Sequence, residues 1–163
     1  MQSNNVGDAF ILQSRLHLKE DFLPKILRCL EQLTEPDIWW RAHQANNSAG
    51  NLVLHLAGNV RQWIISGLGG AEDKRHRALE FAERGPLPKA ELLAKLEETL
   101  AEADKVLANF PSAQLTEERT IQGFRKTGLQ TILHVVEHFS FHTGQIIYIT
   151  KLRLGVDLKF YDL

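Results

Sequence analysis

Three histidines recur at intervals of four residues along one short stretch of the chain: His134, His138 and His142. In a helix, residues four apart lie on the same face, about 6 Å from one another along the axis. Two imidazoles at this spacing can bind one metal ion, and neutral imidazoles suit zinc, nickel, copper or iron. Gln145 follows three residues after His142 and extends the same face. The stretch therefore predicts a helix face that binds a transition metal.

A second polar stripe lies in an earlier segment that is otherwise apolar, where His55, Asn59 and Gln62 are spaced by four and three residues. Buried polar groups need partners, so polar stripes on two largely apolar helices are expected to face each other. His55 with two histidines of the later segment would then form a site with three protein ligands. Such a site keeps open coordination positions, which is typical of catalytic rather than structural metals.

The stretch from His134 to His138 also matches H-x-x-E-H, a signature of one class of zinc proteases. Those enzymes use a further acidic ligand far downstream, but no Glu follows His138, and Asp157 and Asp162 are the only acids in the remaining 25 residues. We therefore reject the protease interpretation. Glu137 lies about 100° around the helix from His138, which predicts a solvated or helix-pairing carboxylate.

The elements that must position these residues are read from apolar periodicity, which predicts four helices. They cover residues 8–33, 47–67, 89–109 and 127–153. In the first, a leucine stripe beginning at Leu12 predicts the buried face, and Pro24 predicts a kink or a division into two helices. Residues 120–124 are compatible with a short strand or hairpin, and residues 71–87 are expected to be a charged connection. The fold class predicted is all-α, a four-helix bundle.

Two helix starts and one helix end carry specific signals. Asn47 or Ser48 is a plausible N-cap for the second helix. Residues 127–130 (TGLQ) form a capping box, in which the Thr hydroxyl and the Gln side chain satisfy free N–H groups reciprocally. Gly155 is a natural stop for the fourth helix.

Composition limits the class of protein. A length of 163 residues predicts one domain covering residues 1–163. The net charge of −1 argues against a nucleic-acid partner, and the short basic runs at 74–77 and 125–126 are expected to be solvated loops. There is no stretch of about 20 apolar residues for a membrane helix and no pattern of a signal peptide, so the expected location is the cytoplasm. Cys29, the only cysteine, is expected in the core.

Residues 51–59 (NLVLHLAGN), 134–146 (HVVEHFSFHTGQI) and the ending 158–161 (LKFY) resemble the DinB-like superfamily of bacterial proteins. The resemblance covers nearly the whole chain and is most specific in the H-x-x-x-H-x-G-Q segment. It implies a bundle with up-down-down-up topology, often a homodimer. It also implies a divalent metal, commonly nickel or zinc, on His55, His138 and His142. His134 has no assured place in that triad, and with His138 it forms the fallback pair if His142 is out of reach.

The superfamily includes enzymes that transfer low-molecular-weight thiols such as bacillithiol and enzymes of thiol-dependent isomerisation. The resemblance therefore implies a metal-dependent transferase acting with a thiol on small electrophiles. His134, Gln145 and Asn59 would orient the substrate or support a ligand. Hydrolysis by the same centre, a non-catalytic metal-binding or interaction protein, and a plain helical dimer without metal stay open, and so does whether the chain is an enzyme.

Overall fold

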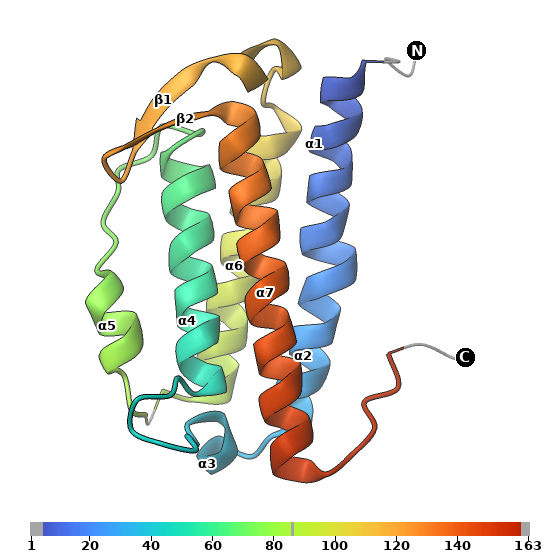
Figure 1. Ribbon diagram of the computed structural model, residues 1–163, viewed down its shortest axis with the longest axis vertical. Helices are drawn as coiled ribbons and strands as arrows, with labels where there is room; N and C mark the ends of the chain where they lie inside the picture. Colours follow the sequence, from blue (N-terminus) through green and yellow to red (C-terminus); the bar gives the residue numbers. More distant parts are fainter. Residues whose placement is uncertain (1–4, 86, 161–163) are drawn as a thin grey trace.

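The computed structural model describes residues 5–85 and 87–160. Residues 1–4, Pro86 and residues 161–163 lie outside the described residues, and with them Tyr161 of the ending quoted above and Asp162. The architecture is all-α with one small β-hairpin (Figure 1). In the described part of the chain, no helix is long and apolar enough to cross a membrane.

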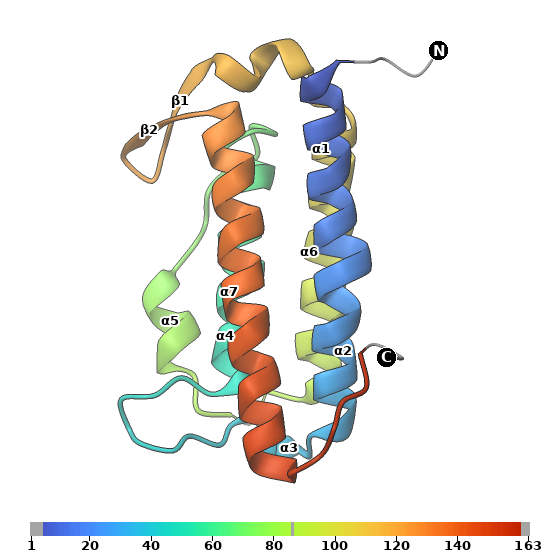
Figure 2. The ribbon, with the colours of Figure 1, turned by 45° about the vertical axis from the view of Figure 1, so that its right-hand side comes forward.

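The first rod joins α1 (Val6–Leu16), a π-helical turn (His17–Phe22) and α2 (Leu23–Gln32). Figures 1 and 2 show the rod as continuous. The predicted division occurs, but the change in hydrogen bonding precedes Pro24, which lies in the first turn of α2, where its missing N–H is tolerated. The leucine stripe was wrong at its start: Leu12 is 52% exposed, whereas Ile11 and Leu18 are buried. A π turn contains more residues than an α turn, so the buried face shifts across it.

The second rod is α4 (Ala49–Val60), which continues as a π-helical turn (Arg61–Ser66). Ser48, one of the two predicted candidates, is its N-cap. The Ser48 hydroxyl accepts the amide N–H of Asn51 at 3.2 Å, and the Asn51 side-chain oxygen accepts the amide N–H of Ser48 at 3.1 Å. Ten of the twelve residues of α4 are buried, because other helices cover it on several sides.

The third rod is α6 (Lys89–Ala108), and the fourth is α7 (Gly128–Leu154). Between them lie a 3-10 turn (Ser112–Thr116) and an antiparallel hairpin of β1 (Glu118–Ile121) and β2 (Phe124–Thr127). The predicted capping box starts α7 with both of its bonds, and Gly155 ends it in the left-handed conformation, with φ 63°. The hairpin is longer than the stretch predicted, and it turns through two residues with positive φ, Gln122 and Gly123.

Consecutive rods do not simply alternate in direction. In Figure 1 the first rod runs down, α4 and α6 run up, and α7 runs down, which is the order that the resemblance implies. Because α4 and α6 run the same way, the chain between them must return along the bundle. This crossover, defined as residues 67–88, carries a short helix, α5 (Arg77–Ala82), which packs against α4. The sequence predicted only a charged connection there. Another short helix, α3 (Glu35–Ile38), links α2 to α4.

One apolar core joins the four rods. Its largest fully buried side chains include Ile26 of α2, Leu56 of α4, Leu96 of α6 and Phe139 of α7. Cys29 is fully buried in this core, as predicted. The core fixes how each helix is rotated about its own axis, and therefore which side chains face the boundary between α4 and α7.

Candidate metal centre

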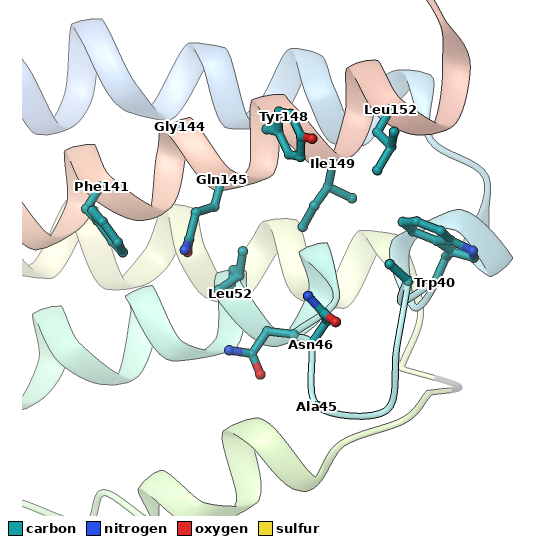
Figure 3. A pocket seen from close by; sticks show the side chains of 12 residues that line it. Trp40, Ala45, Asn46, Leu52, Phe141, Gly144, Gln145, Tyr148, Ile149 and Leu152 are labelled. Atoms are coloured by element: carbon teal, nitrogen blue, oxygen red, sulfur yellow. The ribbon is translucent and has the colours of Figure 1, made fainter.

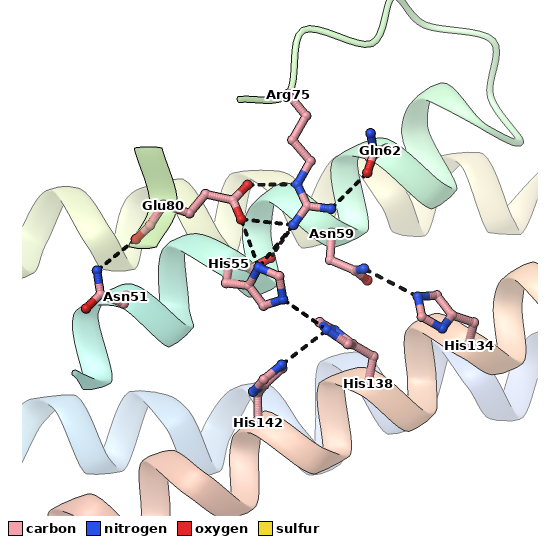
Figure 4. A network of polar contacts seen from close by, with 9 residues as sticks. All are labelled: Asn51, His55, Asn59, Gln62, Arg75, Glu80, His134, His138 and His142. Atoms are coloured by element: carbon pink, nitrogen blue, oxygen red, sulfur yellow. Dashed lines mark hydrogen bonds and ion pairs between the residues drawn. The ribbon is translucent and has the colours of Figure 1, made fainter. Parts of the chain in front are cut away.

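Three histidine side chains from two helices converge at the boundary between α4 and α7 (Figure 4). The Nε2 atom of His138 lies 3.0 Å from Nε2 of His55 and 3.1 Å from Nε2 of His142. The ligand atoms of all three lie within 4.8 Å of one another, close enough to hold one metal ion. These are the three residues that the resemblance implied, and the two polar stripes face each other as predicted.

The helix phase explains why the histidines reach this boundary. On α7, His134, His138 and His142 each come directly before a buried residue of the core face. Those buried neighbours are Val135, Phe139 and Thr143. Residues that follow one another in a helix are rotated by about 100°, so a histidine beside each core residue lies at the edge of the buried face. The histidines are consequently half-buried and point along the side of α7 that meets α4.

A glutamate from the crossover sets the tautomer of His55. The Nδ1 atom of His55 lies 2.8 Å from Oε2 of Glu80. Burial by itself would raise the pKa of Glu80, but hydrogen bonds and charges from Arg75 and His55 outweigh it and lower this pKa. The carboxylate is therefore ionised and can only accept, so in a neutral His55 ring the Nδ1 proton points to Glu80 and Nε2 presents a lone pair to the cluster; Nη2 of Arg75 lies 3.1 Å from the same Nδ1 atom.

His142 is oriented in the same way by Gln145. The Gln145 side-chain oxygen accepts the Nδ1 proton of His142 at 2.6 Å. Burial lowers the pKa of His142, although this hydrogen bond opposes the effect, so the ring is neutral at pH 7. Its Nε2 atom therefore also presents a lone pair toward His138.

The three histidines fit a bound divalent transition metal, because they cannot satisfy one another's hydrogen-bonding groups. Burial, together with the neighbouring histidines and Arg75, lowers the pKa of His138 to about 3, so this ring is neutral and carries one proton. On Nδ1, that proton has no acceptor among the described residues, and three lone pairs then converge. If the proton is on Nε2 instead, it can be donated to only one of the two facing Nε2 atoms, that of His55 or that of His142. A cation bound by the three Nε2 atoms removes this conflict, and neutral imidazole is a good ligand for zinc and nickel.

The crossover supports the cluster through a buried ion pair. Arg75 contacts both oxygens of Glu80, with Nε 2.7 Å from Oε1 and Nη2 2.9 Å from Oε2. The Arg75 side chain is only 5% exposed, so the expectation of a solvated basic loop is wrong at this residue. Buried Gln62 accepts from Arg75 Nη1 at 2.9 Å. Asn51 donates to the backbone oxygens of Glu80 and Glu83 and so ties α5 to the start of α4.

No sequence pattern identified Arg75 and Glu80 as parts of the site. They are five residues apart in a stretch where charged residues are frequent, and no hydrophobic periodicity predicts the crossover's path. Glu137, by contrast, is exposed, as its position on the helix predicted.

His134 lies beside the cluster but outside it. Its Nε2 atom is 3.5 Å from the side-chain nitrogen of Asn59, and its ring packs against Trp63 with the ring centroids 4.5 Å apart. Since His142 is within reach of His138, the fallback pair of His134 with His138 is not needed. Gln145 therefore contacts a histidine of the triad, His142, whereas Asn59 contacts His134 outside it.

Two depressions border the cluster. A cleft of about 450 Å³ is lined by His55, Asn59, Trp63, Arg75, Arg77, Gln122, Phe124, Lys126, His134 and His138. A groove of about 510 Å³ lies between α7 and the loop that precedes α4 (Figure 3). Gln145 lines this groove while it holds His142. Phe141 and Tyr148 also line it, and both are largely exposed. Small molecules therefore have space on both sides of the cluster.

The family described as "Protein of unknown function (DUF1572)" matches residues 5–160. The chain belongs to this family. It is also similar to a solved structure described as the conserved protein of locus from Enterococcus faecalis. The TM-score is 0.70 and the identity 16%, and the match covers 96% of this chain and 99% of that one. At this identity the likeness shows the shared fold alone. No curated protein matches the chain.

Proposed function

We propose that the chain binds one divalent transition-metal ion, nickel or zinc, through His55, His138 and His142. We propose further that this centre serves a transferase reaction in which a low-molecular-weight thiol attacks a small electrophile. The observation that carries the proposal is the convergence of three Nε2 atoms. In His55 and His142, an oxygen atom facing Nδ1 keeps the ring proton there, so Nε2 is left with a lone pair.

The chain's own residues would do the positioning. Glu80 and Gln145 fix the tautomers of His55 and His142, so the ligand lone pairs are directed before any ion arrives. A bound divalent metal lowers the pKa of a thiol or water, so that a nucleophile exists near neutral pH. Three protein ligands leave coordination positions open, and the cleft beside His55 and His138 gives a small molecule access.

The choice of thiol transfer over hydrolysis rests on the resemblance to the DinB-like superfamily, because fold alone does not specify a reaction. Glu80, the carboxylate that contacts the cluster, is held by Arg75 and His55 and is therefore not free to activate water. A non-catalytic metal protein is the second candidate. It predicts bound metal with no effect of thiols on the metal's spectrum.

Metal content tests the proposal directly. Untagged wild-type protein, His138→Ala and the control His43→Ala would be dialysed against zinc or nickel and measured by elemental mass spectrometry. His43 is exposed and lies outside the cluster, so its variant has the same substitution without touching the site. We expect close to one equivalent in the wild type and the control and little in His138→Ala. Negligible metal in all three proteins would refute the proposal.

Thiol binding would then be followed on the cobalt- or nickel-loaded protein. A thiolate ligand produces a charge-transfer absorption band that water and oxygen ligands do not. Appearance of that band on adding a small thiol supports the transferase, and transfer assays with electrophiles would follow. A spectrum unchanged at saturating thiol favours the non-catalytic alternative.

We also propose a homodimer. The exposed side of α7 carries large apolar side chains, with Phe141 64%, Tyr148 68% and Leu152 55% exposed. Contiguous exposed apolar surface is typical of interaction sites. Analytical ultracentrifugation of the wild type and of Tyr148→Asp should show a dimer that the substitution weakens, and a monomeric wild type would refute the proposal.

A further inference from the structure

The cleft beside the histidine cluster has an unbalanced charge. Its lining includes three cations, Arg75, Arg77 and Lys126, and no carboxylate. Arg75 is neutralised by Glu80. Among the described residues, neither Arg77 nor Lys126 forms an ion pair, and Glu137, the one acid of α7, is exposed and does not line the cleft. Two positive charges therefore face this space without a counter-ion from the described chain.

The hairpin directs one of these charges into the cleft by strand alternation. Successive side chains of a strand point to opposite faces, so Phe124 and Lys126 share one face of β2. Both line the cleft. Arg125 lies between them, faces the other way and pairs with Glu118 across the hairpin. Arg77 approaches from the start of α5, where its guanidinium lies over the ring of Phe81, 4.9 Å from its centroid.

A residue that lines the same cleft, Asn59, carries a buried acceptor without a partner in the described chain. Asn59 is 4% exposed, and its side-chain oxygen has no hydrogen-bond partner among the described residues. A buried acceptor left unsatisfied costs about 1–3 kcal/mol, which a donor on a bound molecule would recover. Trp63 and Phe124 add aromatic surface to the cleft, whose volume suits a small molecule.

We propose that this cleft binds an anionic small molecule, with its carboxylate or phosphate group at Arg77 and Lys126 and an N–H or O–H group at the Asn59 oxygen. This proposal deepens the proposed function, and only the role of the bound molecule as a reactant rests on that function. A molecule held there lies beside His55 and His138, so it would be a reactant of the metal centre. The binding itself depends on the two cations and on Asn59, and can be measured without any activity.

The test is a titration of zinc-loaded protein with succinate in one arm and inorganic phosphate in the other, followed by amide signals in two-dimensional NMR. The test variant is Arg77→Gln/Lys126→Gln. The matched control is Lys74→Gln/Arg125→Gln, which removes the same charge from residues outside this cleft. Arg77→Lys/Lys126→Arg keeps both charges, and Asn59→Leu removes the acceptor.

We expect signals of residues 122–126 and 134 to shift, and binding to weaken about tenfold in the test variant while the control stays within about twofold of the wild type. The charge-keeping variant should retain binding. Tighter binding of succinate assigns the anionic group as a carboxylate, and tighter binding of phosphate assigns a phosphate. Equal binding by the test variant and the wild type, or equal loss in the control, would overturn the inference. A protein that binds these anions but keeps no metal would refute the proposed function alone.

Discussion

Glu80→Gln removes one negative charge from the support of the cluster and almost nothing else. Glu80 accepts three hydrogen bonds of 2.7 to 2.9 Å, two from Arg75 and one from His55. The amide has only one acceptor oxygen. If that oxygen takes the position of Oε2, it still accepts from His55 and from Nη2 of Arg75, and the NH₂ group then faces the Nε–H group of Arg75. The substitution therefore separates the role of the charge from the role of the side chain's shape.

The size of the effect follows from the burial of Arg75. Removing one partner of a buried ion pair typically costs 3–5 kcal/mol, because the other charge is left without compensation. Here Gln62 still accepts from Arg75, and the amide oxygen still accepts from His55 and from Nη2 of Arg75, so we expect a loss of about 2–3 kcal/mol in the free energy of unfolding. The zinc affinity should fall about 10- to 100-fold, as for other losses of a ligand's hydrogen-bond partner.

Two assays read these quantities separately. Urea unfolding of metal-free protein gives the stability, and competition with a chromophoric chelator gives the zinc affinity. Glu137→Gln is the matched control, since it makes the same change on exposed α7 surface next to His138, and its stability should stay within about 0.5 kcal/mol of the wild type. If Glu80→Gln matched this control in both assays, the support role of the crossover would be refuted.

Three further predictions concern the scaffold. Hydrogen bonds from Thr34 and Arg153 lower the pKa of Asp37 in the folded protein. The stability that Asp37 contributes is therefore fully present above the pKa of about 4 that it has in the unfolded chain, and it is lost as the pH falls through the lower pKa of the folded state. Acid titration of unfolding should therefore be shallower in Asp37→Asn than in the wild type. Gly155→Ala should cost about 1 kcal/mol in thermal unfolding, because Gly155 has positive φ and open space around it. Phe139→Ala should cost about 3–5 kcal/mol in urea, and a loss below about 1 kcal/mol would contradict its place in the core.

Most of the scaffold could be predicted because it depends on local patterns. The capping box at Thr127, the N-cap at Ser48 and the left-handed stop at Gly155 are short signals, and all three are present. Apolar periodicity also predicted the helices found at α4, α6 and α7. The error at Leu12 arose because a straight helix was assumed across the π turn, and no local residue pattern signals that turn.

The candidate site could be predicted only where it is carried by periodic helices. His55 and the α7 histidines follow from spacing, because the two helices pack against each other. Arg75 and Glu80 could not be found in this way. Their positions depend on the path of the crossover, which is set by contacts with Asn51 and Gln62 that are distant in sequence. The cationic cleft was missed for the same reason, since Arg77 and Lys126 come from separate segments.

The return of the chain between α4 and α6 gives the protein a part that, apart from Arg75 and Glu80, can change in evolution independently of the four rods. The four rods carry the histidines and the core, so most substitutions there risk the fold or the cluster. The crossover and the hairpin supply Arg77, Phe124 and Lys126, yet neither contributes a histidine to the triad. Loops tolerate substitution and changes in length better than packed helices do. Relatives with the same three histidines could therefore accept different molecules by changing these two segments alone.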